Sequence, residues 1–222
     1  MSIPCSDSRS IPVTRTLLAL VVGGALALPA FTSIQAAHAA GAGVEAKMNY
    51  CQDCHGPAGQ GFHGFYPIPR LAGQQPDYIK NQLQAFIQHR RTNNIMFNVA
   101  HSLQPSVIDA LANRFSHFNP RPLSPGSRRL AEAGRKIFEN GMPEANIAAC
   151  AACHGPEAKG HGEIPTLAGQ LPDYVFNKLM NWSKERGQNP SLPDTSLIME
   201  PVAHSLNQAQ AQAVAAYVSS LR

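Results

Sequence analysis

Two copies of the motif Cys-x-x-Cys-His, at residues 51–55 and 150–154, constrain this chain more than any other feature. Two cysteines at this spacing can form thioether bonds with the two vinyl groups of one haem, and the histidine that follows then supplies an axial nitrogen to the iron. Each copy runs on into Gly-Pro, so the match extends beyond the motif. We therefore predict two covalently bound haem c groups, attached through Cys51, Cys54, Cys150 and Cys153 and ligated by His55 and His154.

The cysteine count favours haem over the other uses of such motifs. The chain has five cysteines, of which four lie in the two motifs and the fifth, Cys5, lies near the N-terminus. A zinc site would require both pairs to converge on one metal and would leave the adjacent histidines unexplained. A thioredoxin-like redox pair would need a βαβ context, which the sequence does not show. Zinc and dithiol chemistry are therefore the disfavoured alternatives.

The N-terminus has the pattern of a secretory signal peptide. Arg9 and Arg15 precede an apolar run at residues 17–31, and Ala37-His38-Ala39 offers a cleavage site between small residues. We predict that residues 1–39 are removed on export to a bacterial periplasm, where haem is attached afterwards. An uncleaved membrane anchor is the alternative. About 180 residues remain after cleavage, enough for two small domains.

The charge balance gives no support for nucleic acid as a partner. The chain carries a formal net charge of +4 at pH 7, and cleavage would remove two arginines and one aspartate. Each haem adds two propionates, so we expect a holoprotein that is near neutral or slightly acidic. The sequence also lacks a basic tract with interleaved aromatic residues, the pattern typical of nucleic-acid binding.

An internal repeat organises the rest of the chain. Residues 69–74 read Pro-Arg-Leu-Ala-Gly-Gln and residues 165–170 read Pro-Thr-Leu-Ala-Gly-Gln, while a second shared element, Met-x-x-Val-Ala-His-Ser-Leu, begins at Met96 and again at Met199. Duplication of a single-haem unit explains this pattern. The predicted organisation after the signal peptide is domain 1 at 40–119, a turn-rich linker at 120–126 and domain 2 at 127–222.

Helical periodicity fills the space between these landmarks. Pro76 and Pro105 each precede an apolar stripe with helical spacing, and similar stripes lie at 130–138 and 214–221. Strand signals are nearly absent, so we predict an all-α fold in which the helices of each domain pack around a haem. The helix before the first haem motif is predicted to be short, at about residues 43–50.

The recurring methionines are the candidates for the sixth iron ligand. Met96 and Met199 occupy matching places in the two repeats. A thioether ligand is a weak donor that stabilises Fe(II) and raises the reduction potential. His101 and His204 also recur and are the rival ligands, which would give sites of lower potential. We favour the methionines and predict a loop or helix-start role for both histidines.

Taken together, these doubled motifs resemble the dihaem cytochromes c4. The resemblance covers nearly all of residues 43–222 and implies two tandem class I cytochrome c domains with His/Met ligation at both irons. It also implies that the carbonyls of Pro69 and Pro165 accept hydrogen bonds from the two haem-ligating histidines. By the same resemblance Leu71 and Leu167 would line the haem pockets.

The two repeats differ in ways that bear on the resemblance. In class I domains the first and last helices cross at a glycine–aromatic contact, which Gly134, Phe138 and Tyr217 fit in repeat 2 but which has no clear counterpart in repeat 1. Arg70 replaces a neutral residue and would either pair with a haem propionate or be solvated. A weak first helix would leave haem 1 more exposed, with a lower potential than haem 2.

The expected function is that of a soluble one-electron carrier, not an enzyme, because both repeats offer a closed pair of axial ligands. Its expected partners are redox proteins such as membrane respiratory complexes, terminal oxidases or periplasmic dehydrogenases, and no small-molecule substrate is expected. The alternative is a dihaem oxidoreductase of the peroxidase or thiosulfate-oxidising type, or the electron-accepting subunit of one. Such an enzyme would need an open or labile iron position.

Overall fold

The computed structural model describes residues 30–123, 126–192 and 195–222. Ala39–Arg222 form one compact unit, and the residues before Ala39 belong to a separate one. Residues 1–29 of the predicted signal peptide lie outside the described residues. Its last part, residues 30–39, is described. In the part of the chain that is described, we find no helix with the length and apolar character needed to span a membrane.

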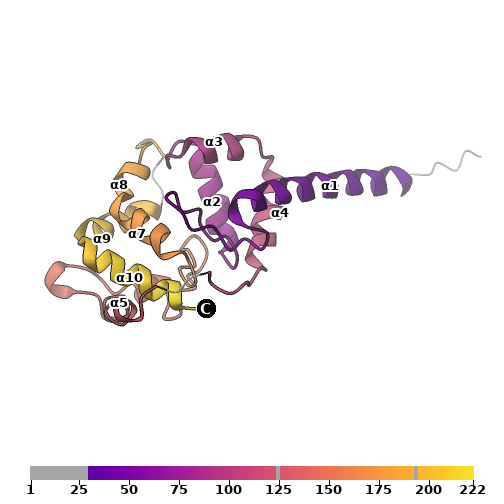
Figure 1. The fold of residues 1–222 in the computed structure, drawn as a ribbon. Helices are drawn as coiled ribbons and strands as arrows, with labels where there is room; N and C mark the ends of the chain where they lie inside the picture. The colour runs from indigo at the N-terminus through magenta and orange to yellow at the C-terminus, as the bar shows by residue number, and fades with distance from the viewer. Residues whose placement is uncertain (1–29, 124–125, 193–194) are drawn as a thin grey trace, which may run out of the picture. The chain divides into compact units, whose positions relative to one another are not determined.

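The fold is all-α, as predicted. Within the described ranges no regular strand forms, and extended pairing is limited to isolated bridges such as Phe62 with Ile68. The elements of repeat 1 are α1 (Ala30–His55), α2 (Pro76–Ile87), α3 (Asn94–His101) and α4 (Pro105–Ser116). Those of repeat 2 are α5 (Arg128–Asn140), η1 (Pro143–Ala145), α6 (Ala151–His154), α7 (Pro172–Met180), α8 (Trp182–Glu185), η2 (Thr195–Ile198), α9 (Met199–Ser205) and α10 (Gln208–Ser220) (Figure 1).

Proline begins two helices where the sequence indicated, because Pro76 and Pro105 stand at the first positions of α2 and α4. Pro172 stands at the first position of α7 in the same way, although the sequence analysis did not predict it. Proline is tolerated there because its missing N–H has no partner inside the helix in any case. The apolar stripe of α4 is buried as expected, through Ile108, Leu111, Ala112 and Phe115.

The first helix corrects one expectation. α1 runs without a break from Ala30 through the haem motif to His55, so the prediction of a short helix at 43–50 is wrong. No proline interrupts this alanine-rich stretch, and alanine has the highest helix propensity. Within the compact unit α1 covers only residues 39–55, so the expectation of a more exposed haem 1 with a lower potential stays a prediction.

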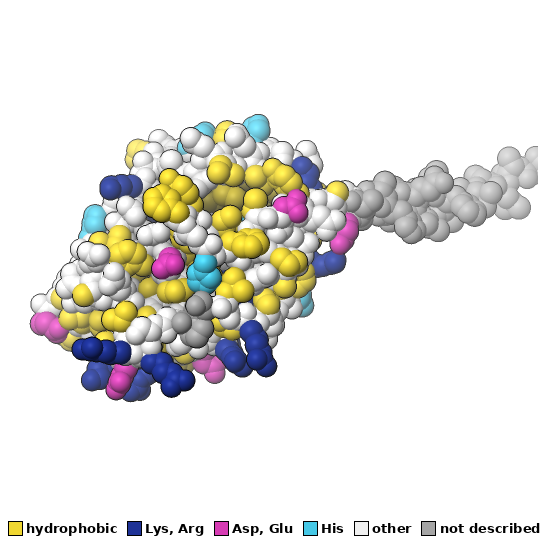
Figure 2. Space-filling model, viewed as in Figure 1, with side chains coloured by type: hydrophobic (Ala, Val, Ile, Leu, Met, Phe, Trp, Pro, Cys, Tyr) yellow, Lys and Arg dark blue, Asp and Glu magenta, His cyan; other side chains and the backbone are white. Residues whose placement is uncertain are grey.

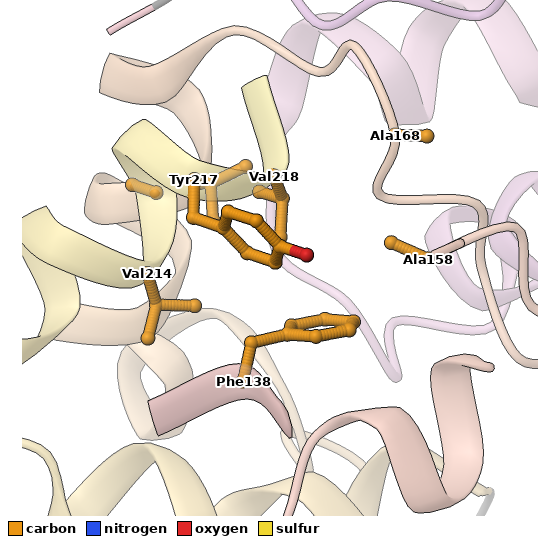
Figure 3. Close-up of a cluster of buried hydrophobic side chains, with 8 residues drawn as sticks. Phe138, Ala158, Ala168, Val214, Tyr217 and Val218 are labelled. Carbon is orange, nitrogen blue, oxygen red and sulfur yellow. The ribbon is translucent and has the colours of Figure 1, made fainter. Parts of the chain in front are cut away.

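Each domain has its own hydrophobic cluster. In domain 1 Met48 of α1 packs with Ile79 of α2 and with Leu111 and Phe115 of α4. In domain 2 Phe138, Val214, Tyr217 and Val218 form the centre of the cluster (Figure 3), and the rings of Phe138 and Tyr217 lie 5.3 Å apart.

The predicted glycine–aromatic crossing of α5 and α10 is confirmed. A Cβ added at Gly134 would lie 1.9 Å from the carbonyl oxygen of Ala213, so only glycine lets the two backbones approach this closely. Phe138 and Tyr217, from the same two helices, pack next to this crossing. The crossing holds the first and last helices of domain 2 together.

Candidate haem sites

The first haem motif ends helix α1. Cys51 is half-buried, Cys54 is exposed and His55 is only 7% exposed. His55 Nδ1 lies 2.9 Å from the carbonyl oxygen of Pro69. A carbonyl can only accept, so Nδ1 carries the proton, which leaves Nε2 as the nitrogen available to an iron. Burial lowers the pKa of His55, although the Pro69 carbonyl opposes this effect, and the neutral imidazole is the form that binds metal.

The second haem motif repeats this geometry on a different scaffold. The short helix α6 ends at His154, which is 4% exposed, and its Nδ1 lies 3.1 Å from the carbonyl oxygen of Pro165. Burial lowers the pKa of this histidine too, again opposed by the carbonyl. As in the first motif, the first cysteine, Cys150, is half-buried and the second, Cys153, is exposed. The exposures of the two motifs therefore match closely.

The loop after each motif folds back through the same backbone bonds. The Gly59 carbonyl accepts from the N–H groups of Leu71 and Ala72, at 2.8 and 2.9 Å. In domain 2 the Ala158 carbonyl accepts from those of Leu167 and Ala168, at 2.7 and 3.0 Å. These bonds hold the Pro-x-Leu-Ala-Gly-Gln segment against the motif. Leu71 and Cys51 both pack against the hydrophobic cluster of domain 1, and Leu167 and Cys150 both pack against that of domain 2.

The candidate sixth ligands begin matching helices. Met96 lies in the first turn of α3, where its N–H donates to the side chain of Asn93, and Met199 is the first residue of α9. Both methionines are half-buried. Their neighbours Ile95 and Ile198 are 73% and 68% exposed, which is unusual for isoleucine. A matching pair of apolar side chains is thus presented beside both methionines.

The rival histidines have a different position from the predicted one. His101 is the last residue of α3, and His204 lies in the last turn of α9, so the expectation of a loop or helix-start role is wrong. A helix C-terminus is a favourable place for a cationic side chain because of the helix dipole. Both side chains are exposed: His101 stacks on Phe97, and His204 Nε2 lies 2.6 Å from the hydroxyl of Ser183.

Arg70 is buried and not solvated, so one of its two predicted roles is excluded. Its side chain is 7% exposed and donates to the carbonyls of Ala72 and Pro120, at 3.1 and 2.9 Å. Its third nitrogen, Nη1, has no partner. Burial lowers the pKa of this guanidinium.

A second buried cationic cluster joins the two domains, and the sequence analysis missed it. Arg91 donates to Gln82 and to the hydroxyl of Tyr174, both at 2.8 Å. Arg186 donates to the same Gln82 oxygen and, at 3.5 Å, to the hydroxyl of Tyr78. Burial raises the pKa of Tyr174, but Arg91, Lys178 and Arg186 outweigh this effect and lower the pKa overall. Arg91 follows α2, and Arg186 follows α8, the short helix after the counterpart of α2. The recurrence of arginine in this part of both repeats was the signal that the sequence offered.

These features fit two haem c groups. The Nε atoms of Arg91 and Arg186 are buried without partners, as is Arg70 Nη1, and in the described part of the chain no carboxylate forms an ion pair with these arginines. Haem propionates are carboxylates, the type of acceptor that such donors need. Figure 2 also shows hydrophobic side chains gathered in and around a hollow on the viewed face, a surface suited to an apolar macrocycle.

The alternatives to haem find no support in the geometry. Burial raises the pKa of Cys51 to about 11 and also raises that of Cys150, whereas a redox-active dithiol needs a lowered thiol pKa. Across the ranges that the structure describes, no group of three or more His, Cys, Asp or Glu side chains is arranged to hold a metal ion such as zinc.

Comparison with known proteins agrees with this site. The model of the Cytochrome c family matches residues 40–111 and 131–222. Cytochrome c4 of Thiocapsa roseopersicina is 35% identical, over 80% of this chain and 90% of its own length. A thiosulfate dehydrogenase electron acceptor of Thiomonas intermedia is 32% identical, over 95% of this chain and 92% of its own. The solved structure of Acidithiobacillus ferrooxidans cytochrome c4 aligns with a TM-score of 0.65 at 36% identity, covering 77% of this chain and 98% of that one.

The chain therefore belongs to the cytochrome c family, and within it to the dihaem cytochromes c4. It has two tandem cytochrome c domains and binds two haem c groups covalently. Its function is electron transfer between redox proteins.

Proposed function

We propose that the chain is an exported one-electron carrier in which both irons are closed by one histidine and one methionine. His55 pairs with Met96 in domain 1, and His154 pairs with Met199 in domain 2. The observation that carries this proposal is that both repeats contain a buried histidine, His55 or His154, whose Nδ1 is directed at a proline carbonyl. That bond fixes the ring orientation and leaves Nε2 for the iron.

The matching methionines support the other half of each site. They occupy the same place in the two repeats, whereas the rival histidines His101 and His204 are exposed at the ends of their helices. When bound, each haem supplies a one-electron Fe(III)/Fe(II) couple, whose potential a thioether ligand raises. Arg70, Arg91 and Arg186 would hold the propionates with their unpartnered nitrogens.

A carrier of this kind needs no acid–base residue and no open iron position. We therefore propose that the chain is not itself an enzyme. Its partners would be membrane respiratory complexes, terminal oxidases or periplasmic dehydrogenases. The similarity to the Thiomonas intermedia electron acceptor makes a thiosulfate-oxidising enzyme a specific candidate for the donor.

We further propose export to the periplasm after removal of residues 1–39. The compact unit begins at Ala39, and the family match begins at residue 40, both close to the expected cleavage site. Mass spectrometry of the protein purified from periplasm tests this proposal. A mature N-terminus at Ala40 and a mass increment of two haems are expected, and an intact N-terminus would contradict cleavage.

The absorption spectrum of the oxidised protein tests the closed sites. Two Met–Fe(III) centres would give the weak far-red charge-transfer band at an intensity corresponding to two haems, with slow or no binding of cyanide. A high-spin component, or rapid cyanide binding by one haem, would contradict the carrier and favour the dihaem enzyme.

A further inference from the structure

The peptide behind each axial histidine is bonded on its other side to a glutamine of the opposite domain. The carbonyl of Pro69, which accepts from His55, and the N–H of Arg70 belong to the same peptide group. That N–H donates to Gln170 Oε1 at 2.8 Å, and Gln170 Nε2 donates back to the Arg70 carbonyl at 2.9 Å. The result is a continuous chain of hydrogen bonds from His55 through one peptide group to domain 2.

The reciprocal chain runs the other way. The carbonyl of Pro165 accepts from His154, and the N–H of the same peptide, on Thr166, donates to Gln74 Oε1 at 2.7 Å. Gln74 Nε2 donates to the Thr166 carbonyl at 3.0 Å. Gln74 and Gln170 are the last residues of the repeated Pro-x-Leu-Ala-Gly-Gln motif, and both are buried, at 5% and 6% exposure.

The orientation of both amides is determined by their partners. Oε1 of Gln170 also accepts from the N–H of Leu171, and Oε1 of Gln74 accepts from that of Gln75. Each oxygen therefore faces two backbone donors while each nitrogen faces a carbonyl, so a flipped amide would lose every one of these bonds.

We propose that Gln170 and Gln74 are positioning residues that act crosswise: Gln170 tunes the axial histidine of domain 1, and Gln74 tunes that of domain 2. The inference rests on the proposed ligation by His55 and His154. A peptide whose N–H is bonded to an amide oxygen is polarised, and its carbonyl becomes a stronger acceptor. A stronger acceptor makes the imidazole a better donor to iron, which favours Fe(III) and lowers the potential. Each domain thereby sets part of the potential of the other.

The test compares Gln170→Leu with Gln74→Leu in the holoprotein. The potential of each haem is followed by NMR of haem-methyl resonances, assigned through contacts to Met96 or Met199. Gln170→Leu raises the midpoint potential of haem 1, and Gln74→Leu raises that of haem 2. We expect a change of up to about tenfold in the Fe(II)/Fe(III) ratio, about 59 mV for a one-electron couple. The Nδ1–H resonance of the crossed histidine shifts as well, a readout independent of electron transfer.

Two further variants separate this role from simple loosening of the interface. Gln75→Leu removes another bond between the domains, from Gln75 Nε2 to the Lys159 carbonyl at 2.8 Å, without touching either histidine-bound peptide, and leaves both potentials unchanged. Gln170→Glu keeps an acceptor oxygen for the Arg70 N–H, so the potential of haem 1 stays at or below the wild-type value.

The outcomes distinguish this inference from the proposed ligation. Equal shifts of both haems, or a shift confined to the domain that carries the mutation, would overturn the crosswise role. An intact far-red band with no crossed shift would overturn the inference alone. Absence of the far-red band from the wild-type protein would instead refute the proposed His/Met ligation itself.

Discussion

In both domains the loop after the haem motif supports the axial histidine through the same backbone bonds, but different side chains pack against this loop. In domain 1 the loop after the haem motif turns at Gly59, and Phe115 of α4 packs against it; a Cβ at Gly59 would lie 2.9 Å from the Phe115 ring. In domain 2 the corresponding residues are Ala158 and Val218, as the matching backbone bonds show. Ala158 and Val218 belong to the same buried cluster, so domain 2 combines one added methyl group with a side chain smaller than Phe115. The backbone bonds are therefore the same in both domains, while a larger residue at the loop position is accompanied by a smaller residue at the helix position.

The approach to the motif also differs. In domain 1 a single helix, α1, runs into the motif, whereas in domain 2 the crossing helix α5 ends at Asn140, and a separate short helix, α6, carries His154. Despite this difference the two histidine–proline bonds are within 0.2 Å of one another, at 2.9 and 3.1 Å. The requirement common to both domains is therefore the histidine and its carbonyl, and the scaffold around them varies.

The largest effect is expected where domain 2 depends on a close backbone approach. Gly134→Ala places a methyl group against the Ala213 carbonyl and should lower the free energy of unfolding by about 3 kcal/mol or more. Denaturant unfolding monitored by circular dichroism and haem absorbance measures it. Gly43→Ala in α1 is the matched control, because nothing lies within 4 Å of its added Cβ, and it should be neutral or stabilising. Equal behaviour of the two variants would contradict the special role of the α5–α10 crossing.

The exchange of volume can be tested directly in domain 1. Gly59→Ala should cost about 2 kcal/mol, from its left-handed backbone (φ +66°) and its contact with Phe115. Phe115→Val recreates the pairing of domain 2, so the double variant should be more stable than the sum of the two single changes predicts, by about 1 kcal/mol. Strict additivity in a double-mutant cycle would show that the two residues are not coupled.

The two tyrosines at the interface between the domains, Tyr78 and Tyr174, should contribute unequally to the free energy of unfolding. Tyr174→Phe removes the 2.8 Å partner of the buried Arg91 and should cost about 1–2 kcal/mol of unfolding free energy. Tyr78→Phe removes only a 3.5 Å contact to Arg186 and should cost clearly less. Each variant serves as the control for the other, because the same hydroxyl is removed from equivalent tyrosines. A larger loss of stability for Tyr78→Phe would contradict the prediction that Tyr174 is the more important partner.

The smallest effect is expected at Ala158. This alanine has φ +55°, which a glycine would adopt without strain, but its methyl group is fully buried. Relief of the strain and loss of about 0.8 kcal/mol of apolar burial nearly cancel, so Ala158→Gly should change stability by less than about 1 kcal/mol. Thermal unfolding measures this, and a loss above 2 kcal/mol would mean that the strain at Ala158 is negligible.

Local sequence rules predicted much of this molecule. Pro76 and Pro105 indicated where two helices begin, because a proline acts on its own turn of the chain. The crossing at Gly134, Phe138 and Tyr217 was predicted instead from the resemblance to class I cytochrome c domains. The reach of α1 was missed because its alanine-rich first part was assigned to the end of the signal peptide and its cleavage site, although alanine favours a helix there.

Contacts between the domains could not be predicted in the same way. Gln74 and Gln170 were visible as the ends of a repeated motif, but their partners lie on segments about a hundred positions away in the chain. The pairing of Arg91 and Arg186 around Gln82 likewise arises only when the two domains dock. Repetition marks such residues as important, and only the docked structure identifies what they bind.

The central claim is that each domain holds its own His/Met iron, and substitution of the methionines tests it most directly. Met96→His and Met199→His are titrated separately, with the wild-type protein as reference. Each change should lower the midpoint potential of its own haem strongly, because imidazole favours Fe(III), and should halve the far-red band. If either substitution leaves its haem potential and the band unchanged, that methionine is not a ligand and the account of two equivalent carrier sites fails.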